Sequence, residues 1–176
     1  MPRFVAFLGS INVGGHRVTM ERLRAEFETL GFTEVWTFIA SGNVVFRASA
    51  KPTSLEPKIE KHLSKTLGFP VTAFVRTDAD VARIAEHVPF RVNAGDSHYV
   101  GLLREVPTAP ATKATVALSG ERDTLVVHRT ELHWRVHGVS LDSNVKPSAL
   151  GKAIGQAMTT RNATSLRKLA AKLETA

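Results

Sequence analysis

The sequence contains no cysteine, and it has one tyrosine and two tryptophans among its 176 residues. Without cysteine, a disulfide framework, a thiolate metal site and a cysteine nucleophile are all excluded. No apolar run is long enough to span a bilayer, and the first nine residues hold too short an apolar stretch for a signal peptide. We therefore expect a cytoplasmic protein that does not enter a membrane.

Familiar catalytic motifs are also missing. No serine stands in a G-x-S-x-G elbow, and no segment reads G-x-x-x-x-G-K-[ST] or G-x-G-x-x-G. His16 could act as an acid or a base, but no partner residue can be identified from the sequence. We make no prediction of enzymatic activity, and we expect neither a cofactor nor a metal ion.

Positive charge is in excess. The chain has 23 Lys and Arg against 16 Asp and Glu, a net charge of +7. Residues 135–176 alone hold seven basic and two acidic residues. Such an excess favours anionic partners, although a solvated surface is the simpler interpretation. Nucleic-acid binding through residues 135–176, without sequence specificity, is the alternative function that the charge suggests.

The first half alternates strand-like and helix-like segments. β-Branched and apolar runs predict strands, and apolar residues three and four apart predict helices. The expected strands are Phe4–Leu8, Glu34–Ala40, Val44–Ala48 and Val71–Arg76. One helix is expected from its Thr19 cap to Gly31, and another from a Thr53–Glu56 capping box to Gly68. This β-α-β-β-α-β order is that of a ferredoxin-like unit.

A similar order follows a connecting helix, Ala79–Val88, which Asp78 caps and Pro89 ends. The expected elements are strand His98–Glu105, helix Ala109–Leu118, hairpin Asp123–Arg129 with Leu132–Val139, helix Pro147–Met158, a short strand at 159–161, and helix Thr164–Leu173. We predict an α+β fold of two tandem ferredoxin-like (α/β plait) units with a C-terminal helix. The first plait spans residues 1–77, the connection 78–96, and the second unit 97–176.

The strands of the first unit are apolar on both faces. In the first strand, Phe4 and Leu8 lie on one face, and Val5 and Phe7 lie on the other. A sheet with one solvated face alternates apolar with polar residues. We therefore expect the second face to be covered, either by the other half of the chain or by a partner chain in a homodimer.

Two loops rich in Gly and Asn mark the candidate site. One is Ser10–Arg17 and the other is Ser41–Asn43, and the β-α-β-β-α-β topology places both at the same end of neighbouring strands. Glycines let the backbone approach a ligand, and a helix N-terminus attracts anions. We predict a site for a small anionic or phosphorylated ligand formed by Asn12, Gly14, Gly15, His16, Arg17, Ser41, Gly42 and Asn43. The alternative is that these residues only make tight turns.

The second hairpin predicts a face that carries histidines. We expect a two-residue turn at Thr130-Glu131, which would place His128 opposite His133. Period-two alternation then assigns one face to His128, His133, Arg135 and His137, and the core face to Leu125, Val127, Trp134 and Val136.

The histidine face has two interpretations. Opposed histidines could bind a metal, but no carboxylate is placed to complete a site, so a solvated basic face is preferred. Since Trp134 falls on the core side and Tyr99 is the single tyrosine, the aromatic platform of RNA-recognition domains is not expected.

Three segments resemble signatures of one bacterial family. They are Ile11-Asn12-Val13-Gly14-Gly15, Ser41-Gly42-Asn43-Val44-Val45-Phe46, and Thr159-Thr160-Arg161-Asn162 with Lys168-Leu169. In this order they resemble the family called domain of unknown function 1697, and the resemblance spans the whole chain. It implies tandem α/β plaits and supplies no function.

The chain departs from that family in two places. Family members usually read Leu-Arg-Gly before Ile-Asn-Val-Gly-Gly, whereas here Gly9 and Ser10 hold the last two of these positions. They also usually carry an aromatic residue where Ala163 stands. If the missing arginine helps to bind an anion, either this chain binds the anion more weakly or Arg17 or Arg161 substitutes for that arginine, and we therefore add Arg161 to the candidate site.

Overall fold

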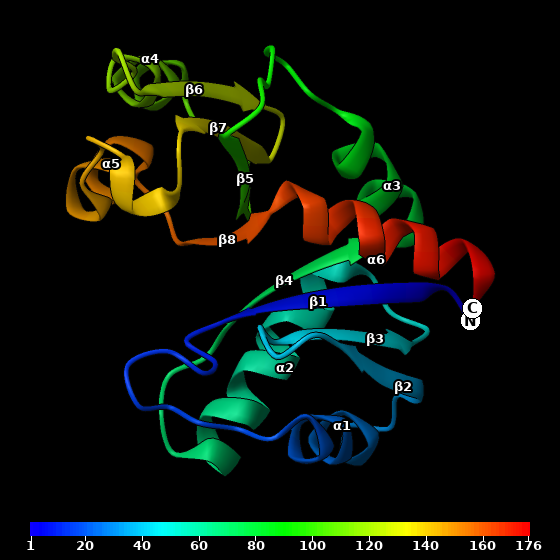
Figure 1. Ribbon diagram of the computed structural model, residues 1–176. Coiled ribbons are helices and arrows are strands. Elements are labelled where there is room, and N and C mark those ends of the chain that lie inside the picture. Colours follow the sequence, from blue (N-terminus) through cyan, green and yellow to red (C-terminus); the bar gives the residue numbers. More distant parts are fainter. The chain divides into compact units, whose positions relative to one another are not determined.

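The computed structural model describes residues 1–176 and contains two compact units, Met1–Ala82 and Arg83–Ala176. Each unit holds a four-stranded antiparallel sheet, with strand orders β2-β3-β1-β4 and β6-β7-β5-β8 (Figure 1). The prediction of an α+β fold with two plait units and a C-terminal helix is confirmed. No helix is both long and apolar enough to cross a membrane.

In the first unit, β1 is the central strand. The elements are β1 (Arg3–Gly9), α1 (Met20–Thr29), β2 (Thr33–Phe38), β3 (Asn43–Arg47), α2 (Pro52–Leu67) and β4 (Thr72–Thr77), followed by α3 (Asp78–Glu86). Ala6 of β1 lies opposite Val44 of β3 on one side and Val75 of β4 on the other. Both α1 and α2 lie on the same face of this sheet (Figure 1).

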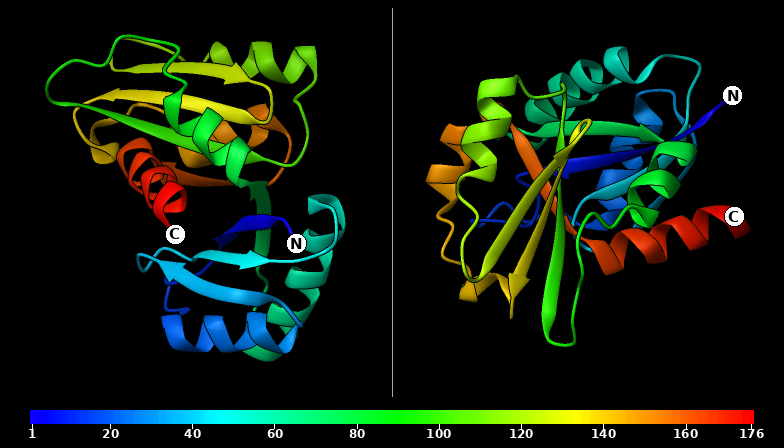
Figure 2. Two further views of the ribbon diagram at one scale, coloured as in Figure 1. Left: turned by 90° about the vertical axis from the view of Figure 1, so that its right-hand side faces the viewer. Right: turned by 90° about the horizontal axis from the view of Figure 1, so that it is seen from above.

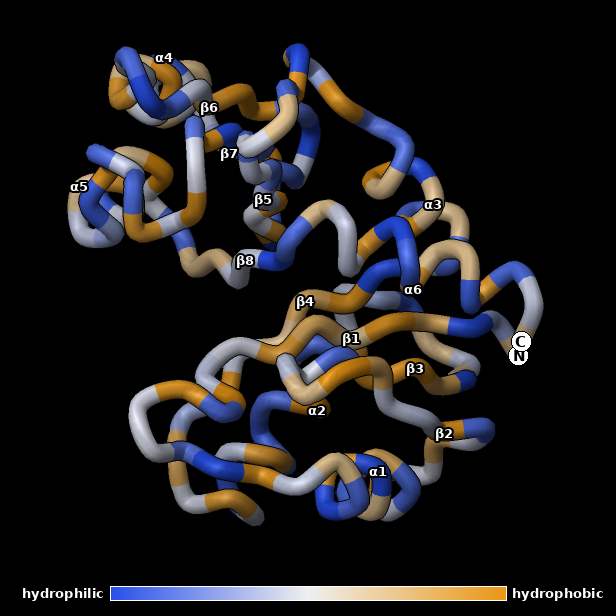
Figure 3. The backbone as a smooth tube through the Cα atoms, viewed as in Figure 1, coloured by the Kyte–Doolittle hydropathy of each residue, from blue (hydrophilic) through white to orange (hydrophobic).

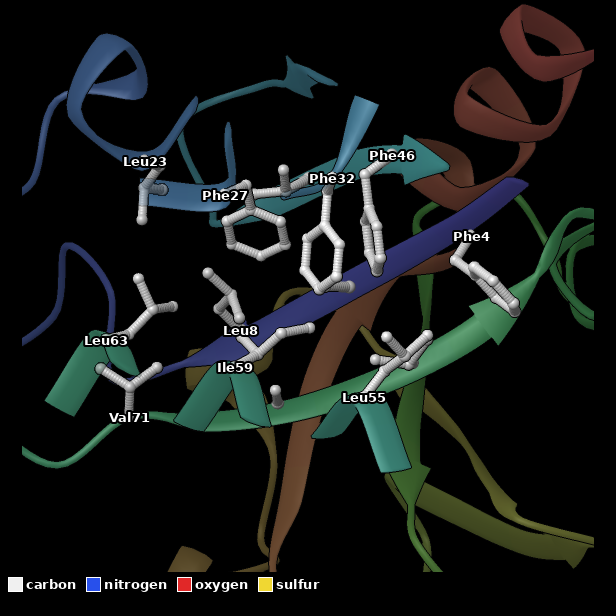
Figure 4. Packing of buried hydrophobic residues seen from close by; sticks show 14 of the residues in the cluster. Phe4, Leu8, Leu23, Phe27, Phe32, Phe46, Leu55, Ile59, Leu63 and Val71 are labelled. Carbon is white, nitrogen blue, oxygen red and sulfur yellow. The ribbon is translucent and has the colours of Figure 1, made fainter. Parts of the chain in front are cut away.

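The core of the first unit lies between that face and the two helices. Phe32 stacks on Phe46 with ring centroids 4.5 Å apart, and Phe27 meets Phe46 edge-on at 5.3 Å (Figure 4). Phe4 and Leu8 join the same cluster, as the alternation of the first strand predicts. The apolar stretches of β1 and β3 are continuous along the backbone (Figure 3).

The opposite face of this sheet is buried as well. Val5, Phe7, Val45 and Phe74 are each at most 1% exposed. This agrees with the prediction that the second face of the first sheet is covered, which rests on apolar residues on both faces of its strands.

Two helix starts differ from the prediction. The N-cap of α2 is Lys51, not Thr53, because Pro52 fits the first turn, where a proline loses no hydrogen bond. Glu56 therefore does not close a capping box. It points inward and accepts a hydrogen bond from the backbone N–H of Val75 at 2.8 Å.

The cap of α3 differs from the prediction too: it is Thr77, one residue before the predicted Asp78. The hydroxyl of Thr77 accepts from the N–H of Asp80 at 3.1 Å, and the Asp80 carboxylate accepts from the N–H of Thr77 at 3.3 Å. Asp78 is thus the first helical residue, and its carboxylate binds Arg3 of β1 at 2.7 Å.

The β2–β3 connection is longer than predicted. β2 ends at Phe38 instead of Ala40, and residues 39–42 form the loop. Ile39 has a φ of +50°, a left-handed conformation that β-branched residues rarely adopt, and its side chain is 49% exposed. The loop therefore holds local backbone strain that side-chain burial does little to offset.

The second unit repeats the architecture. After α3 it contains β5 (Asp96–Leu103), α4 (Ala109–Val116), β6 (Asp123–His128), β7 (Glu131–His137), a short 3₁₀ turn at Ser140–Asp142, α5 (Pro147–Ile154), β8 (Met158–Asn162) and α6 (Ala163–Thr175) (Figure 2). β5 is central, between β7 and β8. Leu166, Leu169 and Leu173 of α6 are buried, and their spacing places them along one side of the helix.

A buried carboxylate organises the core of this unit. Leu125 and Leu132 pack with Leu150 of α5 and with Trp134. The Asp123 carboxylate accepts from Trp134 Nε1 at 2.8 Å, from Ser143 Oγ at 2.6 Å and from the N–H of Asn144 at 2.9 Å. It therefore joins the sheet to the segment that precedes α5.

The register of the second hairpin is two residues from the predicted one. The turn is Arg129-Thr130, and His133 lies opposite Val126, not His128. Because the shift is even, the two faces keep their predicted members. The solvated basic face is wrong, however, since His133 and Glu131 are fully buried and His98 is 6% exposed.

Truncation of Phe46 to Ala should lower the free energy of unfolding by about 3–5 kcal/mol, because it leaves a cavity among three phenyl rings. Leu141 is 93% exposed, so Leu141→Ala is a control that should change stability by less than about 0.5 kcal/mol. Urea unfolding of both variants measures the difference. Equal losses would contradict this account of the core.

Replacing Ile39 by Asn should raise the free energy of unfolding by about 1 kcal/mol, because Asn tolerates the left-handed conformation. Thr37→Asn, in the regular part of β2, is the matched control and should lower it. Thermal unfolding of the two variants would show opposite shifts, and a loss of stability in Ile39→Asn would rule out strain at this position.

Candidate functional site

The loop that follows β1 is fastened by the side chain of Asn12. Its amide donates to the carbonyl of Ala40 at 2.8 Å, and its Oδ1 accepts from the N–H of Val18 at 2.9 Å. The first bond reaches the β2–β3 loop and the second spans the β1–α1 loop. Asn12 itself has a φ of +56°, which Asn adopts more readily than most residues. The two predicted loops therefore do meet.

Gly42 holds the same junction from the other side. The N–H of Leu8 donates to the carbonyl of Gly42 at 2.9 Å, which extends the β1–β3 ladder. A Cβ on Gly42 would lie 3.2 Å from Cβ of Ile11, and its φ is +78°. Any other residue would bring its Cβ unusually close to Ile11 and would be strained at this φ. Gly42 is therefore a structural residue of the site.

A cavity of about 600 Å³ opens beside these loops. Its lining residues are Asn12, Gly14, Gly15, Arg17, Val18, Thr19 and Ala40. Four of these residues are on the predicted list. The volume lies within the range of about 300–1,000 Å³ that is usual for small-molecule sites.

Part of the backbone around the cavity is already hydrogen-bonded. The N–H of Asn12 donates to the carbonyl of His16. The N–H of His16 donates to the carbonyl of Val13, and that of Arg17 to the carbonyl of Gly15. The N–H groups of Gly14 and Gly15 make no hydrogen bond within the chain. Both glycines have positive φ, 59° and 89°. Two successive donors in a turn are therefore available to an acceptor in the cavity.

Arg17 lies between this cavity and a second one. The second cavity, of about 490 Å³, shares Arg17, Val18 and Thr19 with the first and adds Arg22 and residues 66, 67 and 69. The guanidinium of Arg17 is exposed and forms no hydrogen bond or ion pair within the chain. It is thus a cation that a ligand in either cavity can use.

Arg22, in contrast, is neutralised. Its Nε donates to Glu26 at 2.6 Å, and Glu26 also binds His62 Nε2 at 2.7 Å. Burial raises the pKa of Glu26, but the hydrogen bonds from Arg22 and His62 outweigh it and hold that pKa below the ordinary 4.5. The carboxylate stays ionised at neutral pH, so Arg17 is the uncompensated positive charge of this region.

The other predicted residues do not line the first cavity. The His16 ring stacks on Phe69 at 4.1 Å, which anchors the loop to the segment before β4. Asn43 is buried and donates to the carbonyl of Phe38 and to Ser41 Oγ, which closes the hairpin.

Arg161 lies in β8, in the second unit. It is 8% exposed and donates to Thr159 Oγ1 at 2.8 Å. Burial lowers the pKa of its guanidinium to about 10, so it is still charged at neutral pH.

Sequence reasoning missed Val18 and Ala40. Ala40 was assigned to the preceding strand, and only the true length of the β2–β3 loop places its carbonyl within reach of Asn12. Thr19 was expected as a helix cap, and its hydroxyl does accept from the N–H of Arg22 at 3.1 Å. No group of three or more His, Asp or Glu side chains is placed to hold a metal ion.

Comparison with known proteins agrees with the fold. A structure titled as that of conserved bacterial protein SP0830 from Streptococcus pneumoniae aligns with a TM-score of 0.77 at 22% identity, over 99% of each chain. No curated protein matches the chain. The family model described as protein of unknown function (DUF1697) matches residues 1–133, which include the first two signature segments. The chain therefore belongs to the DUF1697 family.

Proposed function

We propose that this protein binds a small anionic or phosphorylated ligand in the cavity between the β1–α1 loop and the β2–β3 loop. The observation that carries the proposal is that three donors without a hydrogen-bond partner in the chain border one cavity. They are the N–H groups of Gly14 and Gly15 and the guanidinium of Arg17, all of which border one cavity. An anion would satisfy all three.

The chemistry of the lining favours an acceptor group over an apolar one. Successive backbone N–H groups form a concave set of partial positive charges that suits a phosphate or carboxylate. The N-terminus of α1 adds its dipole, and Thr19 is its cap. Arg17 supplies the full charge, with a forked geometry that matches two oxygens of one anion.

The proposal is one of binding, not of a reaction. Arg17 is the one ionisable side chain in the lining of the first cavity. His16 faces Phe69 instead, so the idea that it acts as an acid or base gains no partner from the structure.

Nucleic-acid binding through residues 135–176 stays a prediction, as does a homodimer. The burial of Arg161 removes one of the seven cations of that segment from the surface. Arg135 is also engaged, since it donates to the carbonyl of Arg91 and to Thr124 Oγ1. A short oligonucleotide whose affinity falls steeply with added salt would support this alternative.

Inorganic phosphate and pyrophosphate should raise the unfolding temperature of the protein, because a ligand selective for the native state stabilises it. Arg17→Gln should weaken that binding about tenfold, the loss expected for one charge-assisted hydrogen bond. Arg24→Gln is the matched control, since Arg24 is an exposed arginine of α1 outside both cavities. Titration calorimetry measures each affinity. The same phosphate affinity in Arg17→Gln and the unaltered protein, or no response to either anion, contradicts the proposal.

Asn12→Asp should lower the free energy of unfolding by about 1–3 kcal/mol, because it replaces the donor to Ala40 with an acceptor. It should also weaken phosphate binding, since it adds a negative charge to the cavity. Asn93→Asp makes the same charge change in an exposed loop of the second unit and serves as the control. If both variants behaved alike, Asn12 would not fasten the loop.

A further inference from the structure

The second sheet carries a cluster of histidines on the face opposite the Leu125 core. We call this the histidine face. The strand registers place these residues on it: Asp96 and His98 of β5, His128 of β6, Glu131, His133, Arg135 and His137 of β7, and Arg161 of β8. Only two of these side chains are acidic, so the face is rich in groups that are or can become positive.

Two of the histidines form a buried pair. His98 Nε2 lies 3.0 Å from His133 Nδ1. His98 is 6% exposed and His133 is fully buried. The other ring nitrogens, His98 Nδ1 and His133 Nε2, have no hydrogen-bond partner. A pair of neutral imidazoles has two N–H groups and two lone pairs. One of each is used between the rings, and whichever tautomers are present, one buried donor and one buried acceptor stay unsatisfied.

The segment at the end of α3, residues 83–90, covers this pair. His87 stacks on His128 with centroids 4.1 Å apart and meets His133 edge-to-face at 4.9 Å. Phe90 meets the His98 ring edge-to-face at 5.0 Å. Arg83 makes two hydrogen bonds with the buried Glu131 carboxylate, at 3.0 and 3.2 Å. Three ring contacts and one buried ion pair therefore hold the segment in place.

The charges around the pair oppose its protonation. Arg83 faces the pair from α3, His87 from the residue after α3, Arg167 from α6 and His128 from β6, while Arg129 in the hairpin turn acts on His87. Arg135 and Arg161 share its sheet face. Of the two carboxylates, Glu131 is occupied by Arg83, and Asp96 binds His137 at 2.7 Å. A proton added to His98 or His133 would therefore meet cations on several sides and no free anion.

We propose that residues 83–90 form a proton-sensitive latch on the histidine face, closed while His98 and His133 are neutral and released when they become protonated. Two like charges 3.0 Å apart in a buried site cannot both persist. The least costly response is to admit water. The ring of His87 covers the rings of His128 and His133, and added positive charge on this cluster would weaken those contacts.

The direction of the pH dependence follows from the burial. Burial lowers the pKa of His98 to about 4 and that of His133 to about 3, against an ordinary 6.5. Released histidines regain the ordinary pKa, so the open state binds more protons than the closed state. The latch is therefore fully stable above pH 6.5, and it loses stability as the pH falls from 6.5 toward 4.

Hydrogen–deuterium exchange of the full chain between pH 7.5 and 4.5 tests the latch, with rates corrected for intrinsic exchange. Below pH 6.5 the opening constant of residues 83–90 should rise roughly tenfold per pH unit for each proton taken up, and so approach about a hundredfold for two. Residues 52–67 of α2, in the first unit, provide the internal reference. Constant protection of residues 83–90 down to pH 5, or an equal change in α2, overturns the proposal.

The double variant His98→Phe/His133→Phe should lose most of this pH dependence, because it replaces both buried polar rings by apolar rings. His62→Gln is the control: it removes a histidine from the first unit and should leave the response of residues 83–90 unchanged. If the double variant does not fold, imidazole NMR of the unaltered protein decides. The His98 and His133 signals should titrate together with the opening, and titration near pH 6.5 in the closed protein overturns the latch.

Discussion

The first unit depends on a central strand, β1, that is hydrogen-bonded on both edges and buried on both faces. Its ladder to β3 extends one residue beyond the start of β3, through the bond from the N–H of Leu8 to the carbonyl of Gly42, so the last turn of the β2–β3 loop is fixed to β1. Gly42 suits this position because a Cβ there would lie only 3.2 Å from Cβ of Ile11 and because its φ of +78° disfavours residues with a side chain. The β1–α1 loop therefore starts from a rigid support, and Asn12 ties it back to the same hairpin. The candidate cavity derives its geometry from the sheet.

Buried carboxylates act as connectors in both units, and each accepts at least one hydrogen bond from another part of the fold. Glu56 reaches the backbone of β4, Asp123 joins β7 to the segment before α5, and Glu131 receives Arg83. A buried charge is costly unless it is paired and hydrogen-bonded. The buried imidazole pair differs from these groups, since each ring keeps one unsatisfied nitrogen. The hydrogen-bonded carboxylates therefore stabilise the fold, whereas the His98–His133 pair leaves the segment that covers it sensitive to protonation.

Most of the fold was predictable from the sequence, because apolar periodicity and glycine stops act locally. The Phe4–Leu8 alternation and the Gly31 and Gly68 stops identified the elements that carry the site. Turn details were less accessible. Arg129 takes a positive φ without being glycine or asparagine, so the hairpin register was missed by two residues. Half of the predicted site residues in the first unit line the cavity. The others support it: His16 stacks on Phe69, Gly42 holds β1, and Asn43 with Ser41 closes the hairpin, contacts that only the tertiary structure shows.

The placement of the central strands has a consequence for biosynthesis. In the first unit, β1 is made first and finds both neighbours, β3 and β4, by residue 77. In the second, β5 pairs with β8, which is translated only after α4, the β6–β7 hairpin and α5. Since domains fold during synthesis from the N-terminus onward, one edge of β5 stays without a partner until β8 has been translated. A nascent chain therefore carries a finished first sheet beside an open second one, and that open strand edge is the part of the molecule most exposed to mispairing.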